Sequence, residues 1–263
     1  MTNRRLGQVI KFFNKEYRED AAGPFLLEAQ KNFISKILKA FNGGFPKHLF
    51  FGDDLFVCYR NLSLLGDERF VRAVEDTRAS EVLMARLWRV YFVAWSMANR
   101  ARYSDGYFLD LGCYNAETLE VALRYVRLLH GDVRLRVIAA DLFENPPSDS
   151  LKSDHGPLLS TVVEKRLSKL CEAHILKGCL PDSLNELPPL KISWAHIDLN
   201  GAEADSRTFE ALIPFLNPGA HVIFDDYGFF RYRDSKLAVD YLIESLKLPP
   251  VVELPTGQGL YIH

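Results

Sequence analysis

In two stretches of this chain, apolar residues are followed directly by aspartate: Ile197-Asp198 and Ile223-Phe224-Asp225-Asp226-Tyr227. The residues before each acid have the short, apolar, β-branched character of a buried strand. Because the carboxyl ends of neighbouring parallel strands meet at one edge of an open sheet, we expect the three carboxylates to lie together there. Such like charges are costly to crowd, and a hard divalent cation such as Mg²⁺ would relieve them. The alternative is that these acids cap the following helices.

Strand-like and helix-like segments alternate from Gly106 to the end of the chain. This alternation predicts an α/β fold with a doubly wound, mostly parallel sheet. Val251–Leu254 and Gly259–Ile262 lie too close together for a crossover, and they predict an antiparallel hairpin at the sheet edge. A terminal hairpin of this kind is typical of a class I methyltransferase sheet, which is Rossmann-like, and differs from the all-parallel dinucleotide fold.

The first hundred residues lack this alternation and are interpreted as mostly helical. Ser80–Arg100 has the apolar spacing of one long helix, whereas Phe45–Phe56 is aromatic and mixed and receives no assignment. We therefore expect residues 1–103 to form a helical cap or oligomerisation region, which makes a homo-oligomer possible. Residues 104–263 then form the catalytic domain.

Composition excludes several classes of protein. The net charge of -2 gives no electrostatic case for binding nucleic acid or an anionic membrane. No apolar run reaches the roughly 18 residues of a membrane span, and the N-terminus lacks the apolar core of a signal peptide. The four cysteines show no metal-binding spacing and are expected to be reduced thiols. These features predict a cytoplasmic protein that acts on a small molecule.

The loop after the first strand, Asp110-Leu111-Gly112-Cys113-Tyr114, carries one glycine in place of the three of a dinucleotide fingerprint. That argues against NAD, whose pyrophosphate must approach the backbone closely. An acid followed by one glycine suits a ligand with an amino-acid moiety, such as S-adenosylmethionine (SAM). Asp141, one strand later, occupies the position at which an acid typically hydrogen-bonds to a ribose. Either acid can instead be an ordinary helix cap.

Taken together, residues 50–263 resemble the macrocin O-methyltransferase family, which is class I, SAM-dependent and Mg²⁺-dependent and acts on sugars. The resemblance rests on three elements: the acids at Asp198 and Asp225-Asp226, which are 27 positions apart; Lys177-Gly178 with the following Asp182-Ser183-Leu184; and Leu87-Trp88-Arg89. The chain departs from the family at Asp198-Leu199-Asn200, where a second Asp is usual.

The resemblance implies a role for each of ten residues. Asp198, Asp225 and Asp226 would bind the metal, with Asp198 also counted as catalytic. The methionine end of SAM would lie at Asp110, Gly112 and Tyr114, the ribose at Asp141, and the adenine beside Lys177 and Gly178. His155, the one histidine in the loop after the second strand, is the candidate general base.

The resulting prediction is a SAM- and divalent-metal-dependent O-methyltransferase that acts on a hydroxyl of a sugar or of a glycosylated secondary metabolite. Two alternatives stay open. A catechol-type enzyme would use a similar acidic site on a phenolic diol, and a non-catalytic SAM-binding protein would not need the acids. A nicotinamide-dependent dehydrogenase is disfavoured by the single glycine and the terminal hairpin.

Overall fold

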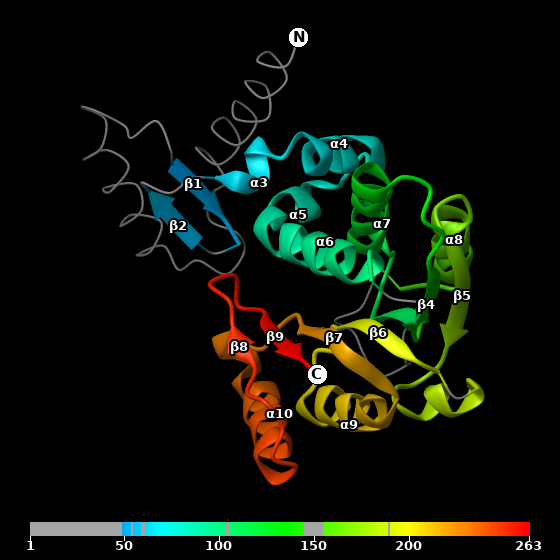
Figure 1. Cartoon of the computed structure of the whole chain (residues 1–263), viewed down its shortest axis with the longest axis vertical. Coiled ribbons are helices and arrows are strands. Elements are labelled where there is room, and N and C mark those ends of the chain that lie inside the picture. The colour runs from blue at the N-terminus through cyan, green and yellow to red at the C-terminus, as the bar shows by residue number, and fades with distance from the viewer. Residues whose placement is uncertain (1–48, 54, 59–61, 104–105, 145–154, 189) are drawn as a thin grey trace. The chain divides into compact units, whose positions relative to one another are not determined.

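The computed structural model describes residues 49–53, 55–58, 62–103, 106–144, 155–188 and 190–263 (Figure 1). The chain divides into two compact units, residues 1–67 and 68–263. The second unit holds helices α4 to α6 together with the sheet. The boundary at residues 103 and 104 predicted from the sequence stays a prediction.

The described part of the first unit contains a β-hairpin. Strands β1 (Leu49–Gly52) and β2 (Leu55–Cys58) pair antiparallel, and the short helix α3 (Ser63–Gly66) follows. Asp53 in the turn has a φ of 53°, in the left-handed region that tight hairpin turns require. The two strands fall largely in Phe45–Phe56, the aromatic stretch that receives no assignment from the sequence.

The second unit is built on a seven-stranded sheet with the order β5-β4-β3-β6-β7-β9-β8. Pairing is parallel from β5 to β7, and the last two strands form the predicted antiparallel hairpin. The order reverses between β3 and β6, which makes this the switch point where ligands bind in such sheets. The strands are β3 (Tyr107–Leu111), β4 (Arg136–Asp141), β5 (Glu172–Lys177), β6 (Ile192–Ile197), β7 (Leu216–Phe224), β8 (Val252–Glu253) and β9 (Gly259–Ile262).

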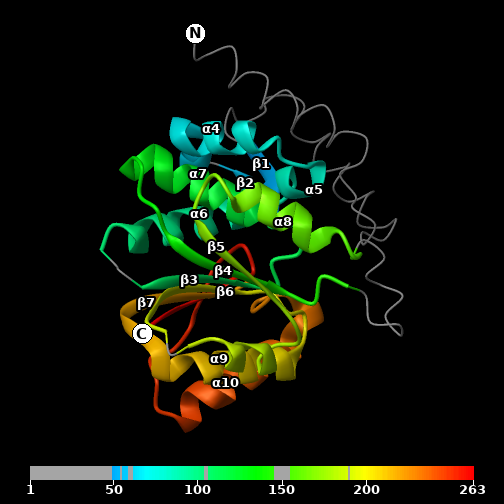
Figure 2. The same ribbon diagram turned by 90° about the vertical axis from the view of Figure 1, so that its right-hand side faces the viewer.

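Helices cover both faces of this sheet (Figure 2). One layer holds α4 (Glu68–Thr77), α5 (Glu81–Met84), α6 (Leu87–Ala101), α7 (Glu117–His130) and α8 (Leu159–Leu167). The opposite layer holds α9 (Ala202–Leu212) and α10 (Arg233–Ser245). The predicted α/β class is confirmed. None of the helices in the described ranges has both the length and the apolar character that a bilayer span needs.

Two predicted helices differ in extent. The single helix expected over Ser80–Arg100 is broken between α5 and α6, where Arg86 has a φ of -119° and a ψ of 30°. Ser80 caps α5 by accepting a hydrogen bond from the amide of Leu83, and its own amide and hydroxyl bind the Glu117 carboxylate. The alternating pattern also predicts a helix over Leu159–Glu172, but α8 ends at Leu167 and Glu172 begins β5.

An aromatic cluster packs the layer between the sheet and α9. Phe209 is fully buried, with its ring edge-on to Phe224 and to Tyr261 at 5.1 Å in each case. These contacts join α9 to β7 and β9, so this core holds the strand that carries Asp225 and Asp226 in place.

We predict that Phe209→Ala lowers the free energy of unfolding by about 3–5 kcal/mol, because it removes buried apolar surface and leaves a cavity. Urea denaturation would measure the loss. Phe215→Ala is the control, since that side chain is 42% exposed, and it should change stability by less than about 0.5 kcal/mol. Equal effects of the two substitutions would contradict the described core.

Candidate active site

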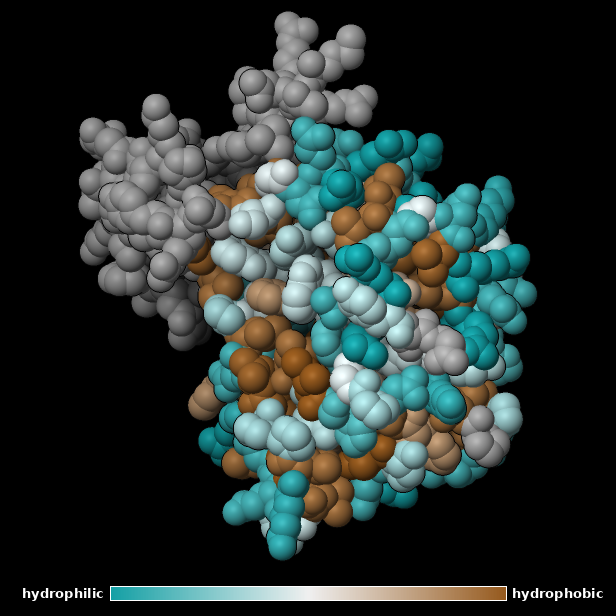
Figure 3. All heavy atoms as spheres, in the orientation of Figure 1, coloured by the Kyte–Doolittle hydropathy of each residue, from teal (hydrophilic) through white to brown (hydrophobic). Residues whose placement is uncertain are grey.

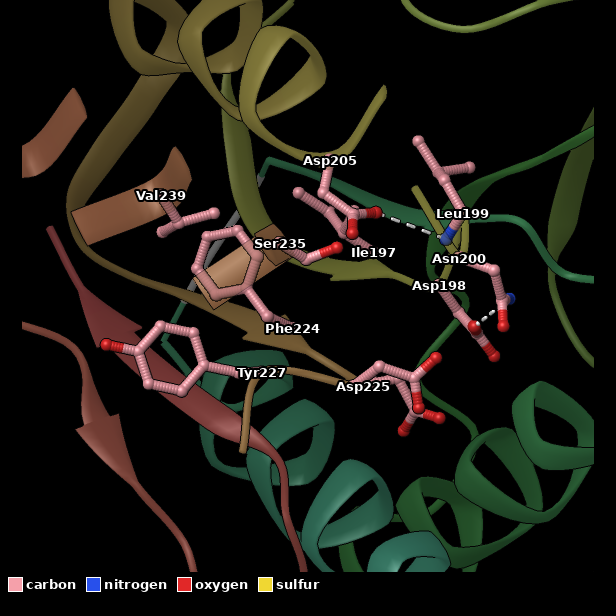
Figure 4. Close-up of a pocket in the computed structure, with 11 residues that line it drawn as sticks. Ile197, Asp198, Leu199, Asn200, Asp205, Phe224, Asp225, Tyr227, Ser235 and Val239 are labelled. Atoms are coloured by element: carbon pink, nitrogen blue, oxygen red, sulfur yellow. Dashed lines mark hydrogen bonds between the residues drawn. The ribbon is translucent and has the colours of Figure 1, made fainter. Parts of the chain in front are cut away.

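Three carboxylates meet at the carboxyl edge of β6 and β7. Asp198 follows the last residue of β6, and Asp225 and Asp226 follow the last residue of β7. The two strands are parallel neighbours with Ile197 opposite Phe224, and the amide of Asp225 donates to the carbonyl of Ile197 at 2.9 Å. Figure 4 shows the side chains of Asp198 and Asp225 turned toward one another. The predicted juxtaposition of the acids is therefore present.

A buried arginine lies against two of these acids. Arg89 of α6 places Nη2 at 2.6 Å from Asp225 Oδ2 and 3.0 Å from Asp226 Oδ1. The same nitrogen donates to the carbonyl of Asp225, and the ring of Phe229 lies 4.6 Å from the guanidinium carbon. The side chain is only 7% exposed. The sequence analysis assigned Arg89 no role, although an arginine on the sheet-facing side of an apolar helix was a usable signal.

Asp225 has partners on its other oxygen as well. Gln258 of the loop before β9 donates from Nε2 to Asp225 Oδ1 at 2.9 Å, and Thr256 donates in turn to Gln258 Oε1. His196 of β6 places Nε2 at 3.4 Å from the same Asp225 oxygen. Asp225 is thus held by three elements of the fold.

His196 also joins Asp225 to the first strand of the sheet. Its Nδ1 lies 2.8 Å from Asp110 Oδ1, and both side chains are buried. Burial lowers the pKa of His196, but hydrogen bonds to Asp110 and Asp225 outweigh it and hold that pKa well above its ordinary value, which favours the charged imidazole. The carboxylate of Asp110 therefore faces a buried histidine. Its predicted contact with the methionine end of SAM stays a prediction.

The acids differ in how well their charge is compensated. Burial opposes ionisation of Asp225, but Arg89 and His196 outweigh it and hold the pKa of that carboxyl below its usual range. Burial and the proximity of Asp225 and Asp226 raise the pKa of Asp198. Burial and Asp225 raise the pKa of Asp226 despite its contact with Arg89. Ionisation of Asp198 and Asp226 is therefore less well compensated than ionisation of Asp225.

These residues fit a hard divalent cation in charge and donor chemistry. Four carboxylates, those of Asp110, Asp198, Asp225 and Asp226, face two cations, Arg89 and His196, which leaves two negative charges. Oxygen ligands of this type suit Mg²⁺. As they stand, no three His, Cys, Asp or Glu side chains within the described ranges form a ready metal-binding group.

A cavity of about 180 Å³ runs from the loop after β3 to Asp198. Its lining includes four of the residues predicted to bind the cofactor: Gly112, Tyr114, Asp141 and Gly178. Lys177 does not line it and instead pairs with Glu144, with its side chain 53% exposed. The structure thus brings the glycine loop, Asp141 and Asp198 to one cavity. Asp225 and Asp226 line a second, smaller hollow, which Asp198 also lines.

Position 112 requires glycine because its backbone lies close to the backbone of Asp198. Its φ is 90°, and a Cβ there would lie 1.9 Å from the carbonyl oxygen of Asp198. Tyr114 and Ala116 in the same loop also have positive φ values, 46° and 56°. Non-glycine residues held in this region are uncommon and gather at functional sites.

Asp141 and His155 lie together on this side of the cavity. Asp141 accepts hydrogen bonds from the amides of Tyr114 at 2.8 Å and Phe143 at 3.1 Å. His155 Nε2 is 3.3 Å from Asp141 Oδ1, and its ring lies 5.2 Å from the ring of Tyr114. The candidate base is therefore placed beside the acid assigned to the ribose.

Comparisons with known proteins agree with this geometry. Two solved structures share the fold: the apo structure of CalS11, a TDP-rhamnose 3'-O-methyltransferase of calicheamicin biosynthesis, and the O-methyltransferase NovP. CalS11 matches with a TM-score of 0.53 and 16% identity over 74% of this chain and 93% of its own. NovP matches with a TM-score of 0.52 and 19% identity over 68% and 81%. The chain has the class I methyltransferase fold.

A curated sequence relative supports the resemblance to sugar O-methyltransferases. It is the 8-demethyl-8-(2,3-dimethoxy-alpha-L-rhamnosyl)-tetracenomycin-C 4'-O-methyltransferase of Streptomyces olivaceus, 27% identical over 132 residues. The match covers 44% of this chain and 51% of that protein, so the chain spans about half the length of the curated relative it matches. No family model matches this chain. On this methyltransferase fold, the cavity beside Gly112 lies at the ligand-binding switch point.

We predict that Asp198→Asn stabilises the metal-free protein. A carboxyl whose folded pKa is raised weakens folding above its ordinary pKa, so the melting temperature should rise near about pH 8 and the gain should vanish near about pH 4. Asp225→Asn should lower the melting temperature, because that pKa is depressed in the fold. Thermal melts in EDTA would test both, with the exposed Asp132→Asn as control. A lower melting temperature for Asp198→Asn would contradict the charge assignment.

Proposed function

We propose that this protein transfers the methyl group of SAM to a hydroxyl of a sugar or a glycosylated small molecule, with the help of a divalent cation. The observation that carries this proposal is the cavity that joins the glycine loop and Asp141 to Asp198, the first acid of the carboxylate cluster. The rhamnose-directed activities named for CalS11 and for the Streptomyces olivaceus relative support a sugar acceptor.

The cofactor would lie along the loop after β3. Gly112 lets this loop pass close to the end of β6, since a side chain at this position would collide with the backbone of Asp198. Tyr114 presents its ring, which is 37% exposed, to the same cavity. Asp141 would accept hydrogen bonds from the ribose hydroxyls, and Gly178 would flank the adenine. Asp110, in the strand that precedes the loop, would interact with the methionine end of SAM.

The acids would hold the cation. Asp198, Asp225 and Asp226 supply carboxylate oxygens at one edge of the sheet, as predicted for Mg²⁺. When bound, the cation would orient the acceptor hydroxyl and lower its pKa. The protein's own contribution is positional: it must hold the acceptor oxygen about 3 Å from the methyl carbon and in line with the breaking bond. Asp198 lines both hollows and so stands between cofactor and acceptor.

A base must take the proton of the acceptor. His155 stays the candidate, because it is the histidine of the cavity and lies 14% exposed against Asp141. A carboxylate partner favours the charged form of an imidazole and orients its ring. To serve as the base, His155 would have to turn away from Asp141 toward the acceptor. The ribose would then take the place of His155 beside Asp141.

The acceptor would approach over the aromatic segment after β7. Phe229 packs against Arg89 and is structural, whereas Phe230 is 84% exposed. Burial and the nearby charges of Asp226 and Asp198 raise the pKa of the Tyr232 hydroxyl. Figure 3 shows apolar side chains gathered over β8, β9 and the start of α10. This surface would receive the apolar part of a glycosylated acceptor.

The three described cysteines outside β2 are free thiols, which fits the proposed cytoplasmic location.

The cofactor assignment predicts tight calorimetric binding of S-adenosylhomocysteine by the wild type. Asp141→Asn should weaken it by about tenfold or more, because a charged hydrogen bond to the ribose is lost. Asp132→Asn, on an acid whose side chain is 91% exposed, should bind as the wild type does. Binding of NAD in place of S-adenosylhomocysteine would overturn the proposal.

The reaction is tested by methyl transfer from SAM to a nucleotide-linked or glycoside rhamnose, with catechol as the competing acceptor. We expect transfer to the sugar hydroxyl, loss of at least about 100-fold in rate with EDTA, and recovery on adding Mg²⁺. Transfer to catechol alone would favour the phenolic alternative. Full activity in EDTA would remove the cation from the proposal.

A further inference from the structure

The three acids at the carboxyl edge differ in how many of their oxygens are already engaged. Both oxygens of Asp225 have partners: Oδ2 binds Arg89 Nη2 at 2.6 Å, and Oδ1 binds Gln258 Nε2 at 2.9 Å with His196 Nε2 at 3.4 Å. One of these partners, the Arg89 guanidinium, is always charged. A carboxylate compensated in this way has little charge left to offer a metal.

Asp198 and Asp226 each keep one oxygen open. Asp198 Oδ1 accepts from the amide nitrogen of Asn200 at 2.8 Å, and Asp226 Oδ1 faces Arg89 at 3.0 Å. Among the described residues, no hydrogen bond or ion pair engages Oδ2 of either acid. Asn200, whose φ of 58° places it in the left-handed region, is fixed beside Asp198 and can offer its amide oxygen.

We propose that Arg89 is a built-in counter-ion that keeps Asp225 out of the metal's coordination sphere, so that the divalent cation is held by Asp198 and Asp226. Asp225 is then a positioning residue that anchors the turn after β7. This inference rests on the cation of the proposed function. It narrows the ligand set of the proposed function and departs from the resemblance, since both assign all three acids to the metal.

The physical basis is that Arg89 cannot readily give way. Its guanidinium is buried, stacked on Phe229, and bonded to the backbone carbonyl as well as the carboxylate of Asp225. Displacing it would leave a buried charge without its partner, which is strongly destabilising. By contact with Asp226 Oδ1, the same guanidinium fixes the second acid with its other oxygen free.

Manganese binding to the full-length protein tests the proposal, with free Mn²⁺ followed by electron paramagnetic resonance. We expect Asp198→Asn and Asp226→Asn each to weaken Mn²⁺ binding by at least about 100-fold, because each removes a charged ligand. Asp225→Asn should weaken it by no more than about tenfold, the effect of an outer-shell partner. Equal losses in all three variants would overturn the proposal.

Asp205→Asn is the matched control. Asp205 is a buried acid beside the same carboxylates, but it accepts a hydrogen bond from the amide of Leu199 at 3.3 Å. Mn²⁺ binding should be unchanged in this variant. A loss as large as that of Asp198→Asn would mean that general negative potential, and not specific ligands, holds the ion, and the proposal would fail.

If Asp225→Asn does not fold, the double variant Arg89→Met/Asp225→Asn replaces the ion pair as a unit, a change that buried pairs often tolerate. Mn²⁺ binding within about tenfold of the wild type supports the proposal, and its abolition in the folded double variant overturns it.

Binding of S-adenosylhomocysteine separates this inference from the proposed function. A wild type that binds Mn²⁺ with the expected variant pattern, but no S-adenosylhomocysteine, would support the inference and refute methyl transfer. A wild type that binds both, with Asp225→Asn as damaging as Asp198→Asn, would refute the inference alone. Binding of S-adenosylhomocysteine without any Mn²⁺ would refute the inference and the cation while leaving methyl transfer in place.

Discussion

The contact of Arg89 with Asp225 and Asp226 is the constraint on which the rest of the site depends. Parallel pairing of β6 with β7 brings three acids to one edge, and burial makes their repulsion costly. A guanidinium from α6 offsets part of that charge, so the helix must pass where its side chain reaches the turn after β7. The break between α5 and α6 starts α6 at Leu87, two residues before Arg89.

The buried polar contacts around Asp225 also connect distant parts of the sheet. His196 lies between Asp110 of β3 and Asp225 after β7, so a single imidazole connects the strand of the cofactor loop to the acid cluster. Gln258 ties in the C-terminal hairpin. The glycine-loop side and the carboxylate side of the site are therefore supported by one buried network, and a substitution on one side is expected to affect the other.

Much of the site follows from local pattern. Acids directly after apolar strands must meet at one edge if the strands are parallel neighbours, so Asp198, Asp225 and Asp226 were identifiable as a group. Gly112 was marked as the turn after the first strand. The partners of these residues could not be identified in this way. Arg89 lies on a helix, His196 inside a strand and Gln258 in the loop before β9, so no common sequence pattern marks the three.

The sequence by itself determined the α/β class, the terminal hairpin and the meeting of the three acids, because periodicity and strand-end position are local properties of the chain. Only the tertiary structure decided which acid is compensated and which is not. That depends on which cations pack within a few ångströms of each carboxylate, and segments more than a hundred residues apart supply them: Arg89 lies 136 positions before Asp225. It also decided that His155 faces Asp141, since a loop residue's partner is set by packing.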